Sequence, residues 1–263
     1  MAENLREKII KGRMVVGTWI SVPDPAVIEI LAQAGFDYLL LDGEHAPINP
    51  SQLVPLALAA ERRGCPIIYR VQANSADLIK AALDVGVDGL MVPMVETPDE
   101  AAAVVAAAKY PPAGRRGMGP WRASNYYMDF QSYIASANER TAIIVQIESK
   151  GAVERAAEIA AVPGVDALFV GPADLAGSLG LPVGTTDPRM IEALKRVVAA
   201  GQSAGRCVGI DAVSNERLEA FAGMGYTLFT FGSDSGYLND GARATAKFAR
   251  GVGQKAEPKT RPR

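Results

Sequence analysis

Histidine, cysteine and surplus charge are scarce in this chain of 263 residues. It has one histidine and two cysteines, and its formal net charge is −2 with a pI near 5.6. This balance creates no basic field, so neither nucleic acid nor an anionic membrane surface is an expected partner, and we expect a small-molecule metabolite instead. Two cysteines, Cys65 and Cys207, make no disulfide framework, and we expect both to be reduced and structural.

Long hydrophobic runs are also missing. Residues 1–11 have no apolar core of signal-peptide length, and no later stretch reaches about 18 uninterrupted apolar residues. We therefore expect a soluble, cytoplasmic protein with no membrane partner. With 49% hydrophobic and 21% charged residues, the chain can bury a large core.

Short apolar runs alternate with stretches of helical spacing from Met14 onward. The runs predict eight strands, at 15–19, 38–42, 66–70, 89–93, 142–148, 167–171, 208–211 and 228–231. Helices are predicted at 25–34, 51–63, 75–84, 99–109, 151–161, 190–204, 215–223 and 235–250, with a short helix opening at Asp174.

This alternation, in a chain near the typical barrel length of about 250 residues, predicts an α/β fold with a single (β/α)8 TIM barrel over residues 1–250. A doubly wound open sheet is the alternative, although no G-x-G-x-x-G follows the first strand. Residues 110–122 contain too much Gly and Pro for regular structure, and a long loop of this kind is often a lid or a site wall. Residues 251–263 predict a disordered polar tail.

The active site of such a barrel lies at the carboxyl ends of its strands. Glu148 and Asp174 close two adjacent strands, so their carboxylates can meet and bind one divalent ion. Oxygen ligands without cysteine favour Mg²⁺ or Mn²⁺ over zinc. The alternative is structural: Glu148 pairs with a residue such as Lys150, and Asp174 caps the helix that follows it.

Two further strand ends suit an anion. The turn Gly171-Pro172-Ala173-Asp174 leaves backbone N–H groups free for a carboxylate or phosphate, unless it is an ordinary strand-to-helix turn. Arg70 ends an apolar strand and must meet an anion or a polarised oxygen, or else pair structurally with Asp42 or Glu44.

The lone histidine, His45, is a candidate acid/base group that Asp42 can orient from three residues earlier, or a satisfied structural histidine. Trp19 and Trp121 can each wall a pocket or belong to the core. Arg122, with Arg115 and Arg116, can meet an anionic acceptor group or remain loop charge.

Five segments together resemble the HpcH/HpaI aldolases, metal-dependent class II pyruvate aldolases that act on 4-hydroxy-2-oxoacids. They are LDGEHAP at 41–47, VPMV at 92–95, YPPAG at 110–114 followed by RG at 116–117, VQIE at 145–148 and VGPADL at 170–175. The resemblance spans residues 17–250, and it implies retro-aldol cleavage to pyruvate and an aldehyde.

The resemblance also implies roles for single residues. Glu148 and Asp174 would hold Mg²⁺, Mn²⁺ or Co²⁺ against the 2-oxo and carboxylate oxygens of pyruvate, with Gln146 nearby and the backbone at Ala173 and Asp174 receiving the carboxylate. Arg70 would steady the 2-oxygen as the enolate forms. His45 would take the proton of the 4-hydroxyl, supported by Asp42 and, across a subunit contact, by Asp84.

The residues themselves specify neither the quaternary structure nor the acceptor aldehyde. The resemblance implies a homo-oligomer, a hexamer with an exchanged carboxyl-terminal helix, for which residues 235–250 are the candidate. The segment 120–127 departs from the family pattern, which leaves the aldehyde open. Three rival functions remain: a Schiff-base class I aldolase using Lys150, an acyl-CoA lyase of the citramalyl or malyl type, and a non-catalytic metabolite-binding barrel.

Overall fold

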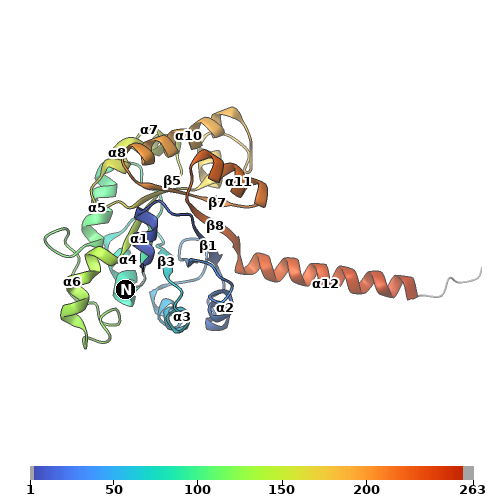
Figure 1. Cartoon of the computed structure of the whole chain (residues 1–263), viewed down its shortest axis with the longest axis horizontal. Helices are drawn as coiled ribbons and strands as arrows, with labels where there is room; N and C mark the ends of the chain where they lie inside the picture. Colours follow the sequence, from blue (N-terminus) through green and yellow to red (C-terminus); the bar gives the residue numbers. More distant parts are fainter. Residues whose placement is uncertain (1–2, 257–263) are drawn as a thin grey trace, which may run out of the picture.

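Every apolar run that predicts a strand forms one in the computed structural model, which describes residues 3–256. The strands are parallel, each pairs with the next one in the chain, and β8 pairs with β1 to close a barrel (Figure 1). The strands are β1 (Val15–Ile20), β2 (Tyr38–Asp42), β3 (Ile67–Arg70), β4 (Gly89–Val92), β5 (Ala142–Ile147), β6 (Ala167–Val170), β7 (Cys207–Ala212) and β8 (Leu228–Ser233). The predicted (β/α)8 barrel is confirmed, and the open sheet is excluded.

Most of the helices surround the barrel, and several begin where a side chain caps them. Asn49 and Gln52 form a capping box at the start of α3, and a left-handed glycine ends it at Gly64. The helices are α1 (Leu5–Ile10), α2 (Pro25–Leu31), α3 (Pro50–Arg63), α4 (Ala76–Val85), α5 (Pro98–Ala108), α6 (Phe130–Arg140), α7 (Lys150–Glu154), α8 (Ala156–Ala161), α9 (Pro172–Ser178), α10 (Pro188–Ser203), α11 (Asn215–Met224) and α12 (Asp234–Ala256).

Several helices differ from the prediction. The single helix expected over 151–161 is divided at Arg155 into α7 and α8. The short helix expected to open at Asp174 begins at Pro172, because proline has the right φ for a first helical position and no N–H to lose there. The helices α1 and α6 were not predicted.

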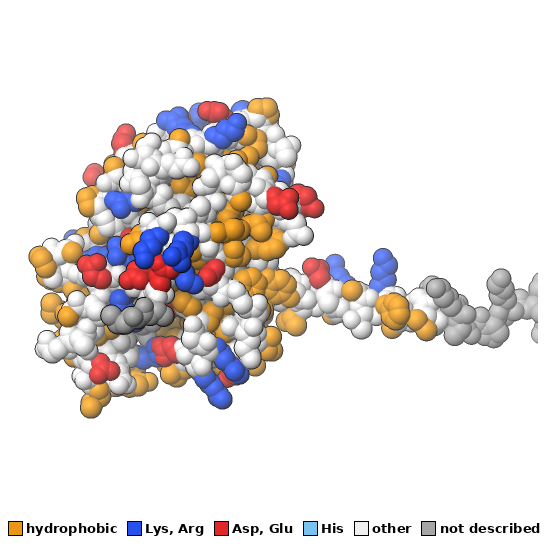
Figure 2. Space-filling view, in the orientation of Figure 1, with side chains coloured by type: hydrophobic (Ala, Val, Ile, Leu, Met, Phe, Trp, Pro, Cys, Tyr) orange, Lys and Arg blue, Asp and Glu red, His pale blue; other side chains and the backbone are white. Residues whose placement is uncertain are grey.

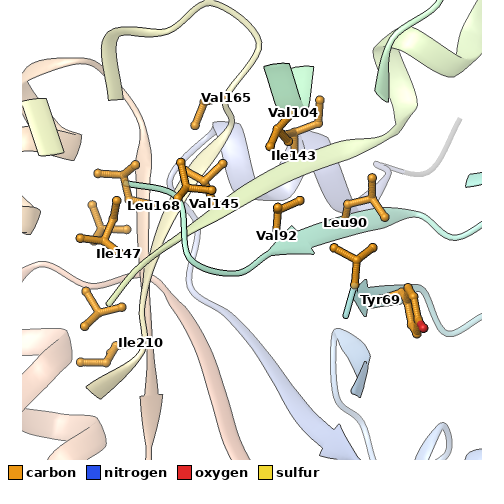
Figure 3. Packing of buried hydrophobic residues seen from close by; sticks show 14 of the residues in the cluster. Tyr69, Leu90, Val92, Val104, Ile143, Val145, Ile147, Val165, Leu168 and Ile210 are labelled. Carbon is orange, nitrogen blue, oxygen red and sulfur yellow. The ribbon is translucent and has the colours of Figure 1, made fainter. Parts of the chain in front are cut away.

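Buried side chains lie on both faces of the strands, which is why the strands read as unbroken apolar runs. One cluster fills the barrel interior, where Tyr38, Leu40 and Phe169 pack against Leu5 and Ile9 of α1 at the amino end. The other lies between the strands and the helices, and Figure 3 shows some of its members, among them Val92, Val145, Ile147, Leu168 and Ile210.

Three connections into the amino ends of strands share the sequence Gly-x-Asp. In each, the glycine has a positive φ, at Gly35, Gly86 and Gly164, and the aspartate carboxylate accepts an N–H from the preceding strand. The three hydrogen bonds run from Val16 to Asp37 at 3.0 Å, from Ile67 to Asp88 at 2.9 Å and from Ile143 to Asp166 at 2.9 Å. Arg6 and Lys8 of α1 pair with Asp166 and Asp37, so this helix is tied to the barrel by charge as well as by packing.

The last helix, α12, projects from the barrel instead of packing on it (Figure 1). Residues 237–250 are all exposed, and hydrophobic side chains lie along the projecting helix (Figure 2). The helix continues to Ala256, past the predicted start of the polar tail at residue 251. The rest of that predicted tail, 257–263, lies outside the described residues.

Both cysteines are buried and unpaired. Burial raises the pKa of each thiol to about 11, so both stay protonated near neutral pH, as expected of structural cysteines. Within residues 3–256, no helix combines the length and the apolar character needed to cross a membrane.

Candidate active site

Arg70 is the centre of the charged cluster at the carboxyl ends of the strands. Asp42 and Arg70 are register partners on β2 and β3, so strand pairing places them side by side. The guanidinium Nε and Nη2 donate to the two carboxylate oxygens of Asp42 at 2.9 Å each. The Arg70 Nη1 lies 2.9 Å from Glu44 Oε2, and its Cζ lies 4.5 Å from the centre of the Trp19 ring. The pairing that was the structural alternative for Arg70 is therefore present, with both Asp42 and Glu44.

The Asp42 carboxylate accepts hydrogen bonds from this arginine and from the backbone. Its Oδ1 also accepts the backbone N–H groups of Glu44 at 3.0 Å and His45 at 3.2 Å, which forms the turn that ends β2. The imidazole of His45 is largely open to solvent: 64% of the side chain is exposed, and its Nε2 lies 3.8 Å from Glu44 Oε2. Among the described residues the Asp42 carboxylate hydrogen-bonds the His45 backbone and not its imidazole, so the orienting role of Asp42 stays a prediction.

Glu44 lies between Arg70 and the other acidic residues of the mouth. Its Oε2 is buried and makes no hydrogen bond within the described residues, because the nearby Arg70 Nη1 is close but not aligned as a donor. Burial raises the pKa of Glu44, with Asp42 and Asp174 adding to the increase and Arg70 opposing it. Glu44 is therefore a partly buried acid with one buried, unused acceptor oxygen.

Glu148 is 3% exposed and faces inward past the end of β5. Its Oε1 accepts the Met94 N–H at 2.6 Å, and its Oε2 accepts the Gln146 amide at 3.3 Å. The pKa of Glu148 is raised to about 7, chiefly by burial; Glu44 and Asp174 contribute to the increase, and the Met94 N–H and Arg70 oppose it. The expected alternative, an ion pair with Lys150, is not formed.

Asp174 lies in the first turn of α9, exposed at the mouth. The first hydrogen bond of that helix runs from the Leu175 N–H to the Gly171 carbonyl at 3.0 Å, so the N–H groups of Ala173 and Asp174 precede the helical ladder. A Cβ at Gly171 would lie 2.5 Å from Glu148 Oε2, so only glycine lets this turn approach the Glu148 carboxylate.

These residues fit a divalent cation of the Mg²⁺ type. Glu148 follows β5 and Asp174 lies just beyond the adjacent strand β6, close enough for Asp174 to raise the Glu148 pKa. Over residues 3–256, no cluster of three or more His, Cys, Asp or Glu side chains forms a metal cage. Mg²⁺ is commonly held by one or two carboxylates, with water and substrate oxygens completing an octahedron, so two carboxylates beside a third acid are a suitable donor set.

Three predicted site residues are not brought to this mouth. Asp84 ends α4 and pairs with Arg116 at 2.8 Å, while Arg122 donates to the Val85 carbonyl and to Glu61. Arg122 also lines a pocket with Asp88, which precedes a strand and so marks the amino end of the barrel. Trp121 is exposed on the same loop. The prediction that this loop walls the site is wrong within one chain, because the loop follows a helix and joins the opposite end of the barrel.

Two contributors to the mouth were missed from the sequence. Asp211 of β7 accepts the Trp19 indole N–H at 2.8 Å and the Thr230 hydroxyl at 2.6 Å. The criterion that selected Asp42, an acid at the carboxyl end of an apolar strand, would also have selected Asp211. Met94 contributes its backbone N–H from a left-handed conformation, φ 54°, which no side-chain pattern could reveal.

The chain matches known proteins over most of its length. The family model described as HpcH/HpaI aldolase/citrate lyase matches residues 15–240. A 4-hydroxy-2-oxovalerate aldolase of Novosphingobium aromaticivorans is 41% identical over 89% of this chain and 90% of its own. A hydroxypyruvate/pyruvate aldolase of Delftia acidovorans is 40% identical over 92% and 91%. The crystal structure of an HpcH/HpaI aldolase/citrate lyase family protein from Burkholderia cenocepacia has a TM-score of 0.88 and 38% identity, covering 94% of this chain and 98% of that one.

Proposed function

Because the chain belongs to the HpcH/HpaI aldolase/citrate lyase family, we propose that it is a class II aldolase, which uses a divalent metal to cleave a 4-hydroxy-2-oxoacid reversibly to pyruvate and an aldehyde. The observation that carries this proposal is the pair of carboxylates, Glu148 and Asp174, which follow the adjacent strands β5 and β6 and lie near the buried Arg70 guanidinium. The relatives named as aldolases of 2-oxoacids support the same chemistry.

The electrophilic half of the reaction lies at Glu148 and Asp174. These residues would hold Mg²⁺, Mn²⁺ or Co²⁺, which would act as a Lewis acid toward the 2-oxo and carboxylate oxygens of the substrate. Arg70 donates to the 2-oxygen as that atom gains negative charge. The free N–H groups of Ala173 and Asp174 receive the substrate carboxylate, and Gln146, Trp19 and Pro172 lie around it.

His45 acts at the other end of the bond that breaks. It removes the proton of the 4-hydroxyl, the C3–C4 electrons move toward C2, and the 2-oxygen takes the charge as the aldehyde forms. An exposed imidazole needs a partner to set its tautomer. We assign that role to Asp84 of a second copy, whose carboxylate is fixed by Arg116. The Arg116 side chain is fully buried, with its Cζ 4.5 Å from the Tyr110 ring.

Oligomerisation is the natural explanation of α12. A helix whose residues 237–250 are all exposed gains little from propensity alone and needs a surface to pack on. Tyr237, Leu238, Phe248 and Val252 are 41%, 64%, 77% and 53% exposed. We propose that α12 is exchanged between copies in a homo-oligomer, a hexamer by family resemblance, and light scattering that gave a monomer would reject this.

Purified protein with Mg²⁺ or Mn²⁺ tests the proposal on a broad panel of 4-hydroxy-2-oxoacids. We expect pyruvate release that EDTA abolishes and that borohydride plus pyruvate leaves intact, because no Schiff base forms on Lys150. No pyruvate from the whole panel would reject the aldolase. Turnover of CoA thioesters instead would identify an acyl-CoA lyase, and borohydride inactivation that is lost in Lys150→Ala would identify a class I enzyme.

Metal binding is expected to depend on pH through Glu148. Its pKa near 7 means that protons compete with the cation below neutrality. The affinity for Mn²⁺, measured by calorimetry between pH 5.5 and 8.5, should therefore rise about tenfold per pH unit below 7 and level off above it. An affinity that does not change over this range would contradict the assignment of Glu148 as a ligand.

A further inference from the structure

Trp19 connects two charged groups that do not touch each other. On one side, the Arg70 Cζ lies 4.5 Å from the centre of the indole ring. On the other, the indole Nε1–H donates to Asp211 Oδ1 at 2.8 Å. The three residues come from β1, β3 and β7, so the indole bridges strands that are not neighbours in the barrel.

Asp211 is itself held in place. The Thr230 hydroxyl, fully buried on β8, donates to the same oxygen of Asp211 at 2.6 Å. Asp211 and Thr230 are register partners on β7 and β8, so strand pairing brings them together. The carboxylate is thus fixed by the sheet, and the indole is fixed by the carboxylate.

A carboxylate is a stronger acceptor for an indole N–H than a neutral group would be. A hydrogen bond to an anion also shifts electron density onto the ring, and a ring with a more negative face attracts a cation more strongly. The Asp42 and Glu44 carboxylates lie beside the edges of the Arg70 guanidinium, so the indole is the group that limits its movement toward β1.

We propose that Asp211 is a positioning residue, which sets the location of Arg70 through the Trp19 indole. The consequence for the reaction rests on the proposed function, in which Arg70 donates to the 2-oxygen as it gains charge. Displacement of such a donor by about 1 Å is enough to lower a rate strongly. Asp211 does not itself touch the reacting atoms in this assignment.

The composition allows a direct spectroscopic test, because Trp121 is the only other tryptophan in the chain. In a Trp121→Phe parent, Trp19 is the sole tryptophan emitter. Asp211→Leu should shift the Trp19 emission and increase its quenching by acrylamide. Asp211→Asn, which keeps an acceptor oxygen, should remain close to the parent. Ser214→Ala, which removes a helix cap just beyond β7, controls for a general loss of stability and should leave the emission unchanged.

Kinetics on the same variants test the link to Arg70. Asp211→Leu should lower kcat and kcat/KM together by about tenfold with KM nearly unchanged, since the affected interaction belongs to the transition state. Asp211→Asn should recover most of that loss. In a Trp19→Phe background, which has no indole N–H to donate to Asp211, adding Asp211→Leu should lower kcat by less than about a further twofold.

Three results would each overturn the proposal. They are unchanged Trp19 emission and quenching in Asp211→Leu, changed emission with unchanged kcat, and an equal kinetic loss in the Trp19→Phe background. If the parent releases no pyruvate from any substrate, the proposed function fails. The emission measurements need no turnover, and unchanged emission in that case would still reject the link between Asp211 and Trp19.

Discussion

Glu148→Ala is expected to lower pyruvate release by at least about 1,000-fold and to remove tight binding of Mg²⁺ or Mn²⁺, because it deletes one of only two proposed protein ligands. Asp174→Ala should have the same effect on binding. The measurements are steady-state release of pyruvate and calorimetric titration with Mn²⁺. Asp187→Ala, which removes a partly exposed carboxylate that caps α10 and pairs with Arg189 far from the Glu148 carboxylate in the fold, is the control and should leave both unchanged.

Glu148→Gln separates a functional role from a structural one. The folded-state pKa near 7 is above the ordinary value of 4.5, so the stability associated with the neutral carboxyl is lost as pH rises through 7. The neutral amide avoids this cost and can still accept the Met94 N–H. Without metal, the free energy of unfolding of Glu148→Gln should therefore exceed that of the parent by on the order of 2 kcal/mol at pH 8. At pH 4.5 the two free energies of unfolding should be equal.

A variant that is inactive and more stable would identify Glu148 as a residue kept for function at the expense of stability. Chemical denaturation in the presence of a chelator, at both pH values, measures the difference. Lower stability of Glu148→Gln at pH 8 would contradict the assignment, because it would mean that the carboxylate is paired favourably within the protein itself.

The barrel could be predicted because its strands are buried on both faces. Runs such as Leu39 to Leu41 and Ile143 to Val145 carry no polar side chain, and their number and spacing leave few architectures. The helix α1 has only six residues, too few for a periodic pattern. The helix α6 follows a segment rich in glycine and proline, and only one of its residues, Ala137, is buried.

The expectation that the active site lies at the carboxyl ends of the strands identified the acidic and basic residues of the mouth, but it did not predict their contacts. Arg70 and Asp42 are far apart in the chain, and their bidentate contact depends on the register of two strands. The exposed position of His45 and the link between Trp19 and Asp211 depend on the closure of the barrel. Contacts of this kind depend on how distant segments pack in three dimensions, and a single sequence does not show which segments pack together.

The end of the barrel at which the predicted loop 110–122 lies could have been read from the sequence. The loop follows the helix α5 and precedes β5, and a connection from helix to strand in this fold lies at the amino ends of the strands, away from the active site. Its length suggested function, but its place in the alternation already excluded the mouth of its own barrel. A role for Asp84, Trp121 or Arg122 in catalysis therefore requires a second copy of the chain.

Arg70→Lys is the variant with the second largest expected effect. Lysine keeps the charge but cannot reproduce the paired contact with Asp42, the contact with Glu44 and the stacking on Trp19. Arg70→Ala would be harder to interpret, because it leaves the buried Asp42 carboxylate and the partly buried Glu44 carboxylate without their cation and should cost about 3–5 kcal/mol of stability. We expect Arg70→Lys to lower kcat for pyruvate release by about 100- to 1,000-fold with a folded protein by circular dichroism.

A partial reaction shows whether that loss belongs to the 2-oxygen. Exchange of the pyruvate methyl protons with deuterium, followed by NMR, requires the enolate but no aldehyde. Arg70→Lys should lower exchange and retro-aldol cleavage by similar factors, because both pass through the same charged oxygen. His45→Gln should lower cleavage by about 100-fold or more and leave exchange largely intact, since the histidine acts only on the 4-hydroxyl. Equal losses in both variants would mean that Arg70 and His45 do not divide the reaction between the two ends of the breaking bond.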